Sequence, residues 1–284
     1  MILVTGATGQ IGSIVLDHLL GENVQVRAFV RDESKLENKN HPKLKTAVGT
    51  FEDRESLKRA MTGVDKLFLV ARDNPDQVEQ HRNVIEVAEE AGVEHIVKLS
   101  AFTASKDSPV SLMRWHAETE EILRNSSLDW TFIRPHLYMQ NILRSGKSVA
   151  EEDFLSAPMS DDAFALIDIR DIAEVAAHVL NSEGHASKVY TLTGPDTTTY
   201  TEVAEILSEL LDKTVDYKYV SQKSFYNHLI EGGRPSWRAY DLAHIADAYS
   251  EGRNITVTND INKLIGRNAR SIREFLTDHL SKFK

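Results

Sequence analysis

Three glycines near the start of the chain constrain its fold more than any other feature. They lie in the segment Val4-Thr5-Gly6-Ala7-Thr8-Gly9-Gln10-Ile11-Gly12, between a short apolar run and an amphipathic stretch. Gly6 permits a tight strand-to-helix turn, Gly9 lets backbone approach a ligand without a Cβ in the way, and Gly12 lets a helix pack closely. In a strand–turn–helix context this spacing is typical of a turn that holds a dinucleotide diphosphate at a helix N-terminus. An ordinary glycine turn is the alternative.

The chain up to about Arg134 alternates short apolar runs with helical periodicity. The runs are MILVT, VQVRAFV, LKTAV, KLFLV, HIVKLS and WTFIR. Segments between them, such as 10–20 and 75–91, are long enough to be crossover helices. Six such units with right-handed crossovers predict an α/β fold with a Rossmann-type, doubly wound parallel sheet.

Beyond Pro135 the pattern loosens. Residues 143–162 are polar and irregular in pattern, ALI at 165–167 predicts a short strand, 171–180 a helix and KVYTLTG another strand. From about Tyr200 the periodicity predicts helices over 201–211, 221–230, 236–250, 258–265 and 271–282. We therefore expect a dinucleotide-binding core over residues 1–150, to which 163–195 return. A smaller, mostly helical lobe over 196–284 is expected to form the substrate cleft.

Composition excludes several function classes. The 33 Lys and Arg against 43 Asp and Glu give a formal net charge of −10, which disfavours direct contact with nucleic acid or anionic membrane. The absence of cysteine excludes disulfides and thiolate chemistry. No apolar run approaches the roughly 20 residues of a membrane span and no signal peptide is recognised, so a cytoplasmic protein is predicted. The 11 histidines show no metal-ligand spacing, and no metal is predicted.

Two cations mark the end of the second predicted strand. Arg31 closes the strand and Lys35 follows one helical turn later. A site for NAD would place an acidic residue here, on the ribose 2′-hydroxyl. Two cations would instead neutralise a 2′-phosphate, so the sequence favours NADP(H) as cofactor. The alternative is that both are solvated surface charges and that Asp32 turns toward the ribose.

The motifs TGATGQIG, GTFEDRESL, WTFIRP and DIRDIA, with Arg31 and Lys35, resemble those of the NmrA-like branch of the atypical short-chain dehydrogenases/reductases. Within that branch the chain is most similar to the triphenylmethane reductase and NADPH:quinone reductase type, over nearly its whole length. The resemblance implies a Rossmann sheet, an NADP(H) site and a cleft under the C-terminal helices. It also implies cofactor contacts at Thr8, Gln10 and Ile11 and, near the adenine, at Thr50 and Phe51. The family usually has an Asp where this chain has Thr50.

The short-chain family at large uses a YxxxK pair on the helix after the fifth strand, with a Ser at that strand's end. Placing Glu120 on the Glu that follows the family Lys puts His116 at the Lys and Leu112 at the Tyr, with Ser100 near the Ser position. The proton-donating tyrosine is therefore missing. Reduction of an isolated carbonyl, which needs a general acid, is disfavoured.

A quinone or an extended cationic dye spreads or neutralises the charge that hydride brings. Such an acceptor can be reduced by binding and alignment, with water as the eventual proton source. We predict hydride transfer from NADPH to quinones or similar conjugated electrophiles. His116 is the candidate catalytic residue, near the nicotinamide ribose and with Glu120 as its partner. An i,i+4 surface pair of His116 and Glu120 is an equally open interpretation.

Ligands of open α/β sheets bind where the parallel strands end. The candidates to face the nicotinamide there are Val70, Ala71, Arg72, Ala101, Phe102 and Pro135, and those for the substrate are Phe102, Tyr138, Asn141 and Trp237. Packed aromatics in the core are the alternative for the rings. Asp168 and Asp171 are expected to cap and anchor a helix.

Two other functions compete with a reductase. A non-enzymatic NADP(H) sensor would act through a protein partner, and the sequence leaves a homodimer open. An epimerase with bound NAD is disfavoured by the missing tyrosine and by Arg31.

Overall fold

A central parallel sheet organises the molecule. The computed structural model describes residues 1–36, 39–250 and 256–284. In this part of the chain seven strands form the sheet: β1 (Ile2–Val4), β2 (Val26–Val30), β3 (Leu44–Val48), β4 (Lys66–Leu69), β5 (His95–Leu99), β6 (Asp129–Pro135) and β8 (Lys188–Leu192). They lie in the order β3-β2-β1-β4-β5-β6-β8, all in parallel. The order runs in opposite directions on the two sides of β1, which confirms the doubly wound α/β fold.

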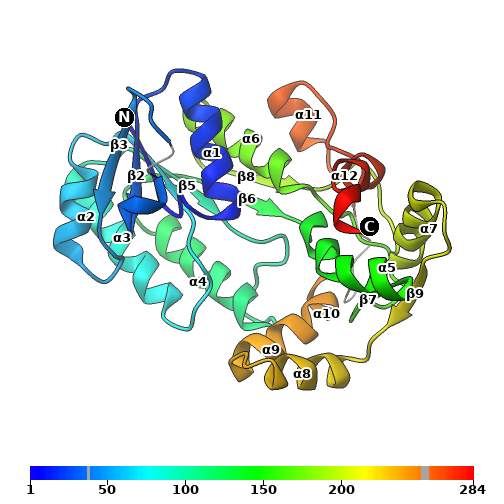
Figure 1. Cartoon of the computed structure of the whole chain (residues 1–284). Coiled ribbons are helices and arrows are strands. Elements are labelled where there is room, and N and C mark those ends of the chain that lie inside the picture. The colour runs from blue at the N-terminus through cyan, green and yellow to red at the C-terminus, as the bar shows by residue number, and fades with distance from the viewer. Residues whose placement is uncertain (37–38, 251–255) are drawn as a thin grey trace.

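Helices cover both faces of this sheet (Figure 1). One face carries α1 (Gln10–Gly21) and α6 (Ile169–Asn181), and the other carries α2 (Arg54–Met61), α3 (Gln77–Ala91) and α4 (Ser111–Arg124), while the short η1 (Glu33–Leu36) follows β2. Successive strand residues point to opposite faces, so Ile2 and Val4 pack into the α1–α6 cluster and Leu3 into the other. Burial on both faces explains why the strands appear in the sequence as continuous apolar runs.

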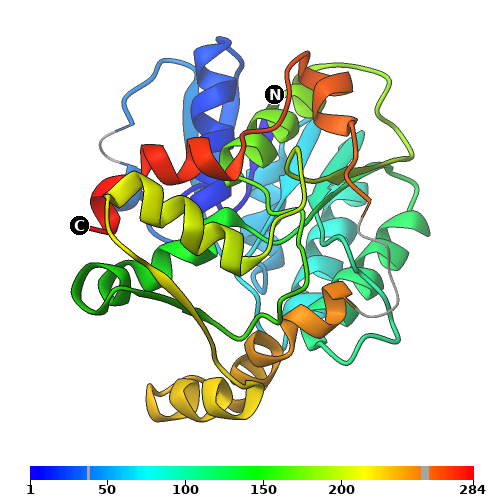
Figure 2. The ribbon, with the colours of Figure 1, turned by 90° about the vertical axis from the view of Figure 1, so that its right-hand side faces the viewer.

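A second group of elements lies beside the edge at which the parallel strands end, which we call the carboxyl edge (Figures 1 and 2). It comprises η2 (Met139–Ser145), α5 (Gly146–Glu152), β7 (Phe154–Ala157), α7 (Tyr200–Leu211), β9 (Asp216–Tyr219), α8 (Gln222–Glu231), α9 (Ser236–Ala243), α10 (Ile245–Ser250), α12 (Ile272–Asp278) and η3 (Leu280–Lys282). A separate apolar cluster holds this group together. One more helix, α11 (Asp260–Ile265), packs instead on α6 and β8.

Three expectations for this second group were wrong. Residues 143–162, expected to be irregular, contain α5 and β7. The strand β7 was missed because it pairs with β9, a partner about sixty residues away that local patterning does not reveal. The segment predicted as a strand at 165–167 contains one isolated bridge, of Ile167 with Tyr138, and Phe164 just before it forms another with Thr198. The predicted helix 236–250 is divided at His244 into α9 and α10.

Two carboxylates at the N-terminal end of α6 hold this helix in place. Asp168 is the N-cap and accepts the backbone N–H of Arg170 at 2.9 Å. Asp171, fully buried, accepts hydrogen bonds from Arg267 and Arg270. Both residues therefore cap and anchor the helix, as predicted. None of the helices in the described part combines the length and apolarity that crossing a membrane requires.

Candidate functional site

The glycine turn connects β1 to α1 at the carboxyl edge. Gly6 has φ +57°, a backbone conformation that favours glycine, and a Cβ there would lie 2.9 Å from the carbonyl oxygen of Val70. A Cβ on Gly12 would overlap the carbonyl oxygen of Gly6. Gly9 is the N-cap of α1, which has neither a side-chain cap nor an acidic residue in its first turn. The first N–H groups of α1 are therefore available to an anion, and the turn fits a diphosphate.

The threonine before these glycines holds the end of β4 against the turn. The Thr5 hydroxyl lies 2.8 Å from the carbonyl oxygen of Val70 and accepts the N–H of Val70 at 2.9 Å. The predicted cofactor contact Val70 is therefore adjacent to Gly6. Sequence patterning offered no signal for this role of Thr5, because its partners lie more than sixty residues away.

Arg31 and Lys35 are exposed beyond the end of β2. Neither forms an ion pair within residues 1–36, 39–250 and 256–284. The Asp32 carboxylate binds its own loop, accepting the Ser34 hydroxyl at 2.7 Å and the Ser34 N–H at 3.1 Å, and these bonds lower the pKa of Asp32. Asp32 is thus turned to Ser34, and two positive charges are left for a phosphate at this position.

The predicted adenine contacts follow β3 beside Arg31. The N–H of Gly49 donates to the carbonyl oxygen of Val30 at 3.0 Å, so the segments that follow β2 and β3 begin side by side. Thr50 is exposed, whereas the half-buried Phe51 ring stacks on Phe29 with centroids 6.0 Å apart. Phe51 therefore belongs partly to the core.

The loops after β4, β5 and β6 meet at the carboxyl edge. The N–H of Phe102 donates to the carbonyl oxygen of Pro135 at 3.1 Å, which ties the loop after β5 to the end of β6. Ala101 and Pro135 are buried, Val70, Ala71 and Phe102 are half-buried, and Arg72 is exposed. The structure thus places these predicted contacts along one edge.

The predicted substrate residues are divided between two sides of that edge. Tyr138 and Asn141 are half-buried on the segment that continues β6, and the N–H of Asn141 donates to the carbonyl oxygen of Tyr138 at 3.0 Å. Burial, with help from the charge of Asp73, raises the pKa of Tyr138. Trp237 lies on α9, and its ring packs edge-on against Trp115 of α4 at 5.2 Å.

An aromatic cluster that the sequence did not reveal surrounds Phe102. The Phe102 ring stacks on Tyr249 of α10 at 6.0 Å and lies 5.0 Å from His136, which is 4.8 Å from Tyr249. His136 is fully buried, and burial lowers its pKa to about 3, so the imidazole is uncharged. We call Phe102, His136 and Tyr249 the aromatic wall.

Several buried polar atoms near this edge have no hydrogen-bond partner in the described part of the chain. They are Gln77 Oε1, Thr103 Oγ1 and both ring nitrogens of His81 and of His136. Buried polar groups in folded proteins are nearly always hydrogen-bonded. Their presence in the segments after β4, β5 and β6 fits a region that receives a polar ligand.

The predicted partnership of His116 with Glu120 is wrong, and so is the surface-pair interpretation. Glu120 is fully buried and accepts the Ser100 hydroxyl at 2.6 Å and Arg134 Nε at 2.9 Å. His116 instead has its Nδ1 2.9 Å from Nζ of Lys98. The physical reason is that β5 and β6 offer donors to the inner face of α4, so the carboxylate binds them rather than the next turn. The Ser100 hydroxyl is occupied by Glu120.

Lys98 is a further residue that the sequence analysis missed. It lies within β5, is fully buried, and donates to the carbonyl oxygen of Leu99 at 3.1 Å as well as to His116. A charged residue inside the apolar run HIVKLS was the available signal.

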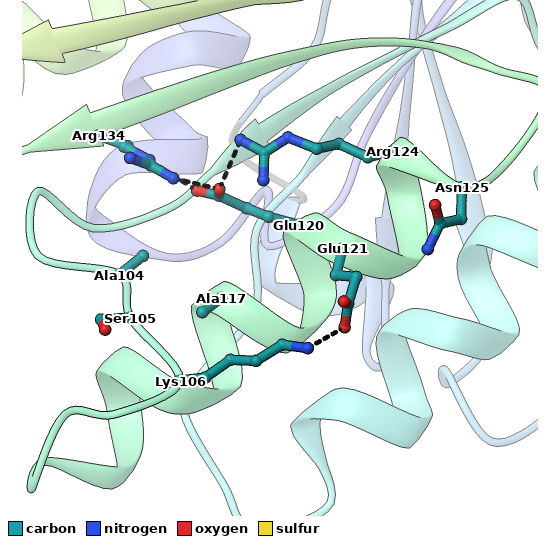
Figure 3. A pocket seen from close by; sticks show the side chains of 9 residues that line it. All are labelled: Ala104, Ser105, Lys106, Ala117, Glu120, Glu121, Arg124, Asn125 and Arg134. Atoms are coloured by element: carbon teal, nitrogen blue, oxygen red, sulfur yellow. Dashed lines mark hydrogen bonds and ion pairs between the residues drawn. The ribbon is translucent and has the colours of Figure 1, made fainter.

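Figure 3 shows a hollow between α4, the loop after β5 and Arg134 of β6. Its lining residues are Ala104, Ser105, Lys106, Ala117, Glu120, Glu121, Arg124, Asn125 and Arg134. The charged side chains there pair with one another: Arg124 lies 3.2 Å from Glu120, and Lys106 contacts Glu121. None of the predicted cofactor contacts lines this hollow, so we assign the site to the carboxyl edge instead.

Two side chains of α9 tie this helix to segments at the carboxyl edge. Arg238 lies 2.7 Å from Asp73 in the loop after β4. The buried Asp241 accepts the N–H of Ser111 at 2.9 Å and of Leu112 at 3.1 Å, and so caps α4 from another element. Among the described residues no group of His, Asp and Glu is arranged to hold a metal ion.

Comparison with known proteins gives matches over the whole chain. The model of the NmrA-like family matches residues 1–277. An NAD(P)H azoreductase from Xenophilus azovorans is 33% identical over 283 residues, which cover 100% of this chain and 99% of that protein. The crystal structure of an NADPH-dependent quinone oxidoreductase from Escherichia coli, complexed with NADPH, matches with a TM-score of 0.90 and 32% identity over 99% of this chain and 100% of that one. The structure of the triphenylmethane reductase of Citrobacter sp. with NADP(H) matches with a TM-score of 0.88 and 32% identity, over 98% and 99%.

Proposed function

This chain belongs to the NmrA-like family, and we propose that it is an NADPH-dependent reductase that transfers hydride to quinones or similar conjugated electrophiles. The relatives named above are reductases of azo compounds, quinones and triphenylmethane dyes, all of them small conjugated molecules. The proposal takes a small molecule of the same class as the substrate of this chain.

One observation carries the choice of cofactor. Arg31 and Lys35 lie free of ion pairs in the described chain, beyond the end of β2 and beside an uncapped helix N-terminus. The first N–H groups of α1, at Gln10 and Ile11, would hold the diphosphate, and the two cations would hold the 2′-phosphate. The crowded glycines leave no room for a Cβ in this turn, which supports the same assignment.

NADPH supplies a hydride when it is bound. The residues of this chain then contribute alignment and exclusion of water. Phe102 is the one ring of the aromatic wall that is only half-buried, and a planar acceptor can stack on it, while Tyr249 and His136 support it from behind. Arg238 and Asp241 tie α9 to the segments that border this edge.

The titratable groups near the wall suit an acceptor that needs no proton as hydride arrives. Burial raises the pKa of Tyr138, which makes its hydroxyl a weak acid, and keeps His136 uncharged. Neither group is matched to general acid catalysis near neutral pH. An acceptor whose charge is delocalised or neutralised by hydride is therefore favoured over an isolated carbonyl.

The proposal is tested with purified protein and NADPH against a panel of benzoquinones, naphthoquinones, a cationic triphenylmethane dye and an azo dye. We expect oxidation of NADPH well above the uncatalysed rate for at least one acceptor, and slower oxidation of NADH. No acceleration with any acceptor would contradict it. A protein that discriminates NADP⁺ from NADPH strongly in calorimetry, yet shows no turnover, would be the sensor instead. A cytoplasmic location, a homodimer and the domain division stay predictions.

A further inference from the structure

Lys98 is a charged side chain at the centre of the sheet that has no carboxylate in contact. Its side chain is fully buried, and among the described residues it forms no ion pair. Its two acceptors, the Leu99 carbonyl at 3.1 Å and His116 Nδ1 at 2.9 Å, are both neutral. Lysine is rarely buried without an ionic partner because desolvation of the ammonium costs more than such bonds return. Stability therefore does not explain a lysine at this position.

Five ionisable groups face Lys98 from four directions. Negative charge comes from Glu120 on α4 and Asp73 after β4, positive charge from Arg134 on β6, and the two imidazoles are His116 on α4 and His81 on α3. Burial lowers the pKa of both histidines well below the ordinary value, and the charge of Lys98 acts in the same direction. His116 is therefore neutral and carries a single ring proton.

The contact with Lys98 decides which nitrogen carries that proton. An ammonium donates hydrogen bonds and accepts none, so Nδ1 of His116 must be the acceptor. The proton then lies on Nε2, which has no partner among the described residues, and the His116 side chain is only half-buried. The imidazole thus presents one N–H donor beside the end of β5.

We infer that Lys98 is a positioning residue: it holds His116 as the Nε2–H tautomer, so that Nε2–H donates to a hydroxyl of the nicotinamide-side ribose of bound NADP(H). This inference rests on the proposed function, since it assigns the donor to that cofactor. Without the ammonium, the neutral ring is free to place its proton on either nitrogen or to turn over, and the donor is offered only part of the time. Loss of the Lys98 ammonium should therefore weaken the binding of the nicotinamide half of the cofactor and leave the binding of the adenosine half unchanged.

The first measurement needs no substitution. Nitrogen NMR of the histidine side chains in the wild-type protein at neutral pH distinguishes the two tautomers, and the His116 signal is identified by its loss in H116Q. We expect a proton on Nε2 and an unprotonated Nδ1. A proton on Nδ1 of His116 would overturn the inference, whether or not the protein reduces quinones. Conversely, a protein without quinone reductase activity could still show the expected tautomer, so the two proposals fail separately.

The second measurement compares two ligands in the variant K98M, which keeps the length of the side chain but not its charge or donors. NADP⁺ contains the nicotinamide ribose, whereas adenosine 2′,5′-bisphosphate lacks it. We expect K98M to weaken NADP⁺ binding about three- to tenfold, the effect of one hydrogen bond, and to leave the bisphosphate unchanged. K98Q, whose amide can still donate to Nδ1, should recover part of the affinity.

K66M is the matched control. Lys66 lies on the neighbouring strand β4, where its Nζ contacts the Ser182 carbonyl at 2.8 Å and Glu183 at 3.0 Å, away from the residues that surround Lys98. We expect it to bind both ligands like the wild type. Equal weakening of both ligands in K98M would show a disturbed sheet and contradict a positioning role. If K98M does not fold, the wild-type tautomer and K98Q decide the question.

Discussion

The guanidinium of Arg238 on α9 lies 2.7 Å from the carboxylate of Asp73, four residues beyond the end of β4. Both side chains are about a quarter exposed, at 26% and 28%. This pair joins two elements that border the carboxyl edge and are 165 positions apart in the chain. Together with Asp241, it ties α9 to the segments after β4 and at the start of α4.

Replacement of Arg238 should loosen α9 with little effect on global stability. We expect R238Q to speed hydrogen exchange of residues 236–243 and to raise KM for the acceptor, while the free energy of unfolding changes by about 1 kcal/mol or less, as for other partly exposed pairs. The control is R273Q, which removes the pair of Arg273 with Glu209, 2.6 Å apart and more exposed. Equal exchange of α9 in both variants would count against this role of Arg238.

The sheet and the cofactor end of the site could be predicted because their signals are local. Each strand is a short apolar run buried on both faces, and the glycine turn and Arg31 lie within one βαβ unit. Such features need only the residues next to them.

The second group of elements and the polar contacts of α4 could not be predicted, because they depend on contacts between segments that are distant in the sequence. β7 is a strand only because β9 lies beside it, and Asp241 caps α4 from 130 positions away. Likewise, spacing alone could not show that Glu120 does not pair with His116. Glu120 binds Ser100 and Arg134 because of the way α4 packs on β5 and β6. Lys98 gave a signal, a charge in an apolar run, but its contact with His116 appears only in the folded chain.

The two cations after β2 should decide the choice between the two nicotinamide cofactors. We expect R31Q/K35Q to lower the ratio of kcat/KM for NADPH to that for NADH about ten- to a hundredfold, because charge-assisted bonds to the 2′-phosphate are lost while the rest of the site is unchanged. K45Q, which removes an exposed lysine from β3, is the control and should leave the ratio as it is. An unchanged ratio in the double variant would refute the assignment of these cations.

The buried lysine should give the stability of the protein a characteristic dependence on pH. Burial lowers the pKa of Lys98 from its ordinary value to about 8 in the folded protein. Between about pH 8 and pH 10.5 the unfolded chain therefore binds more protons at this residue than the folded one, and stability rises with pH. Relative to K98M, the wild type should gain up to about 1.4 kcal/mol per pH unit above pH 8 and show no such trend below it.

Denaturant unfolding of both proteins at a series of pH values measures this difference, with K66M as the reference for a lysine that is not fully buried. Subtracting the variant removes the titration of all other groups that the two proteins share. A difference that falls as the pH rises would mean that Lys98 is held charged by its surroundings.

Two glycines of α1 provide a matched pair for the phosphate turn. A Cβ on Gly12 would overlap the backbone oxygen of Gly6, whereas a Cβ on Gly21, the last residue of the helix, would meet nothing within 4 Å. We expect G12A to push α1 away from the turn, to lower the free energy of unfolding by about 1–3 kcal/mol and to weaken NADPH binding at least tenfold. G21A should instead leave NADPH binding unchanged and stabilise the protein by about 0.5–1 kcal/mol, because alanine restricts the unfolded chain. Urea unfolding and titration with NADPH measure both effects, and normal cofactor binding by G12A would show that the diphosphate does not depend on this turn.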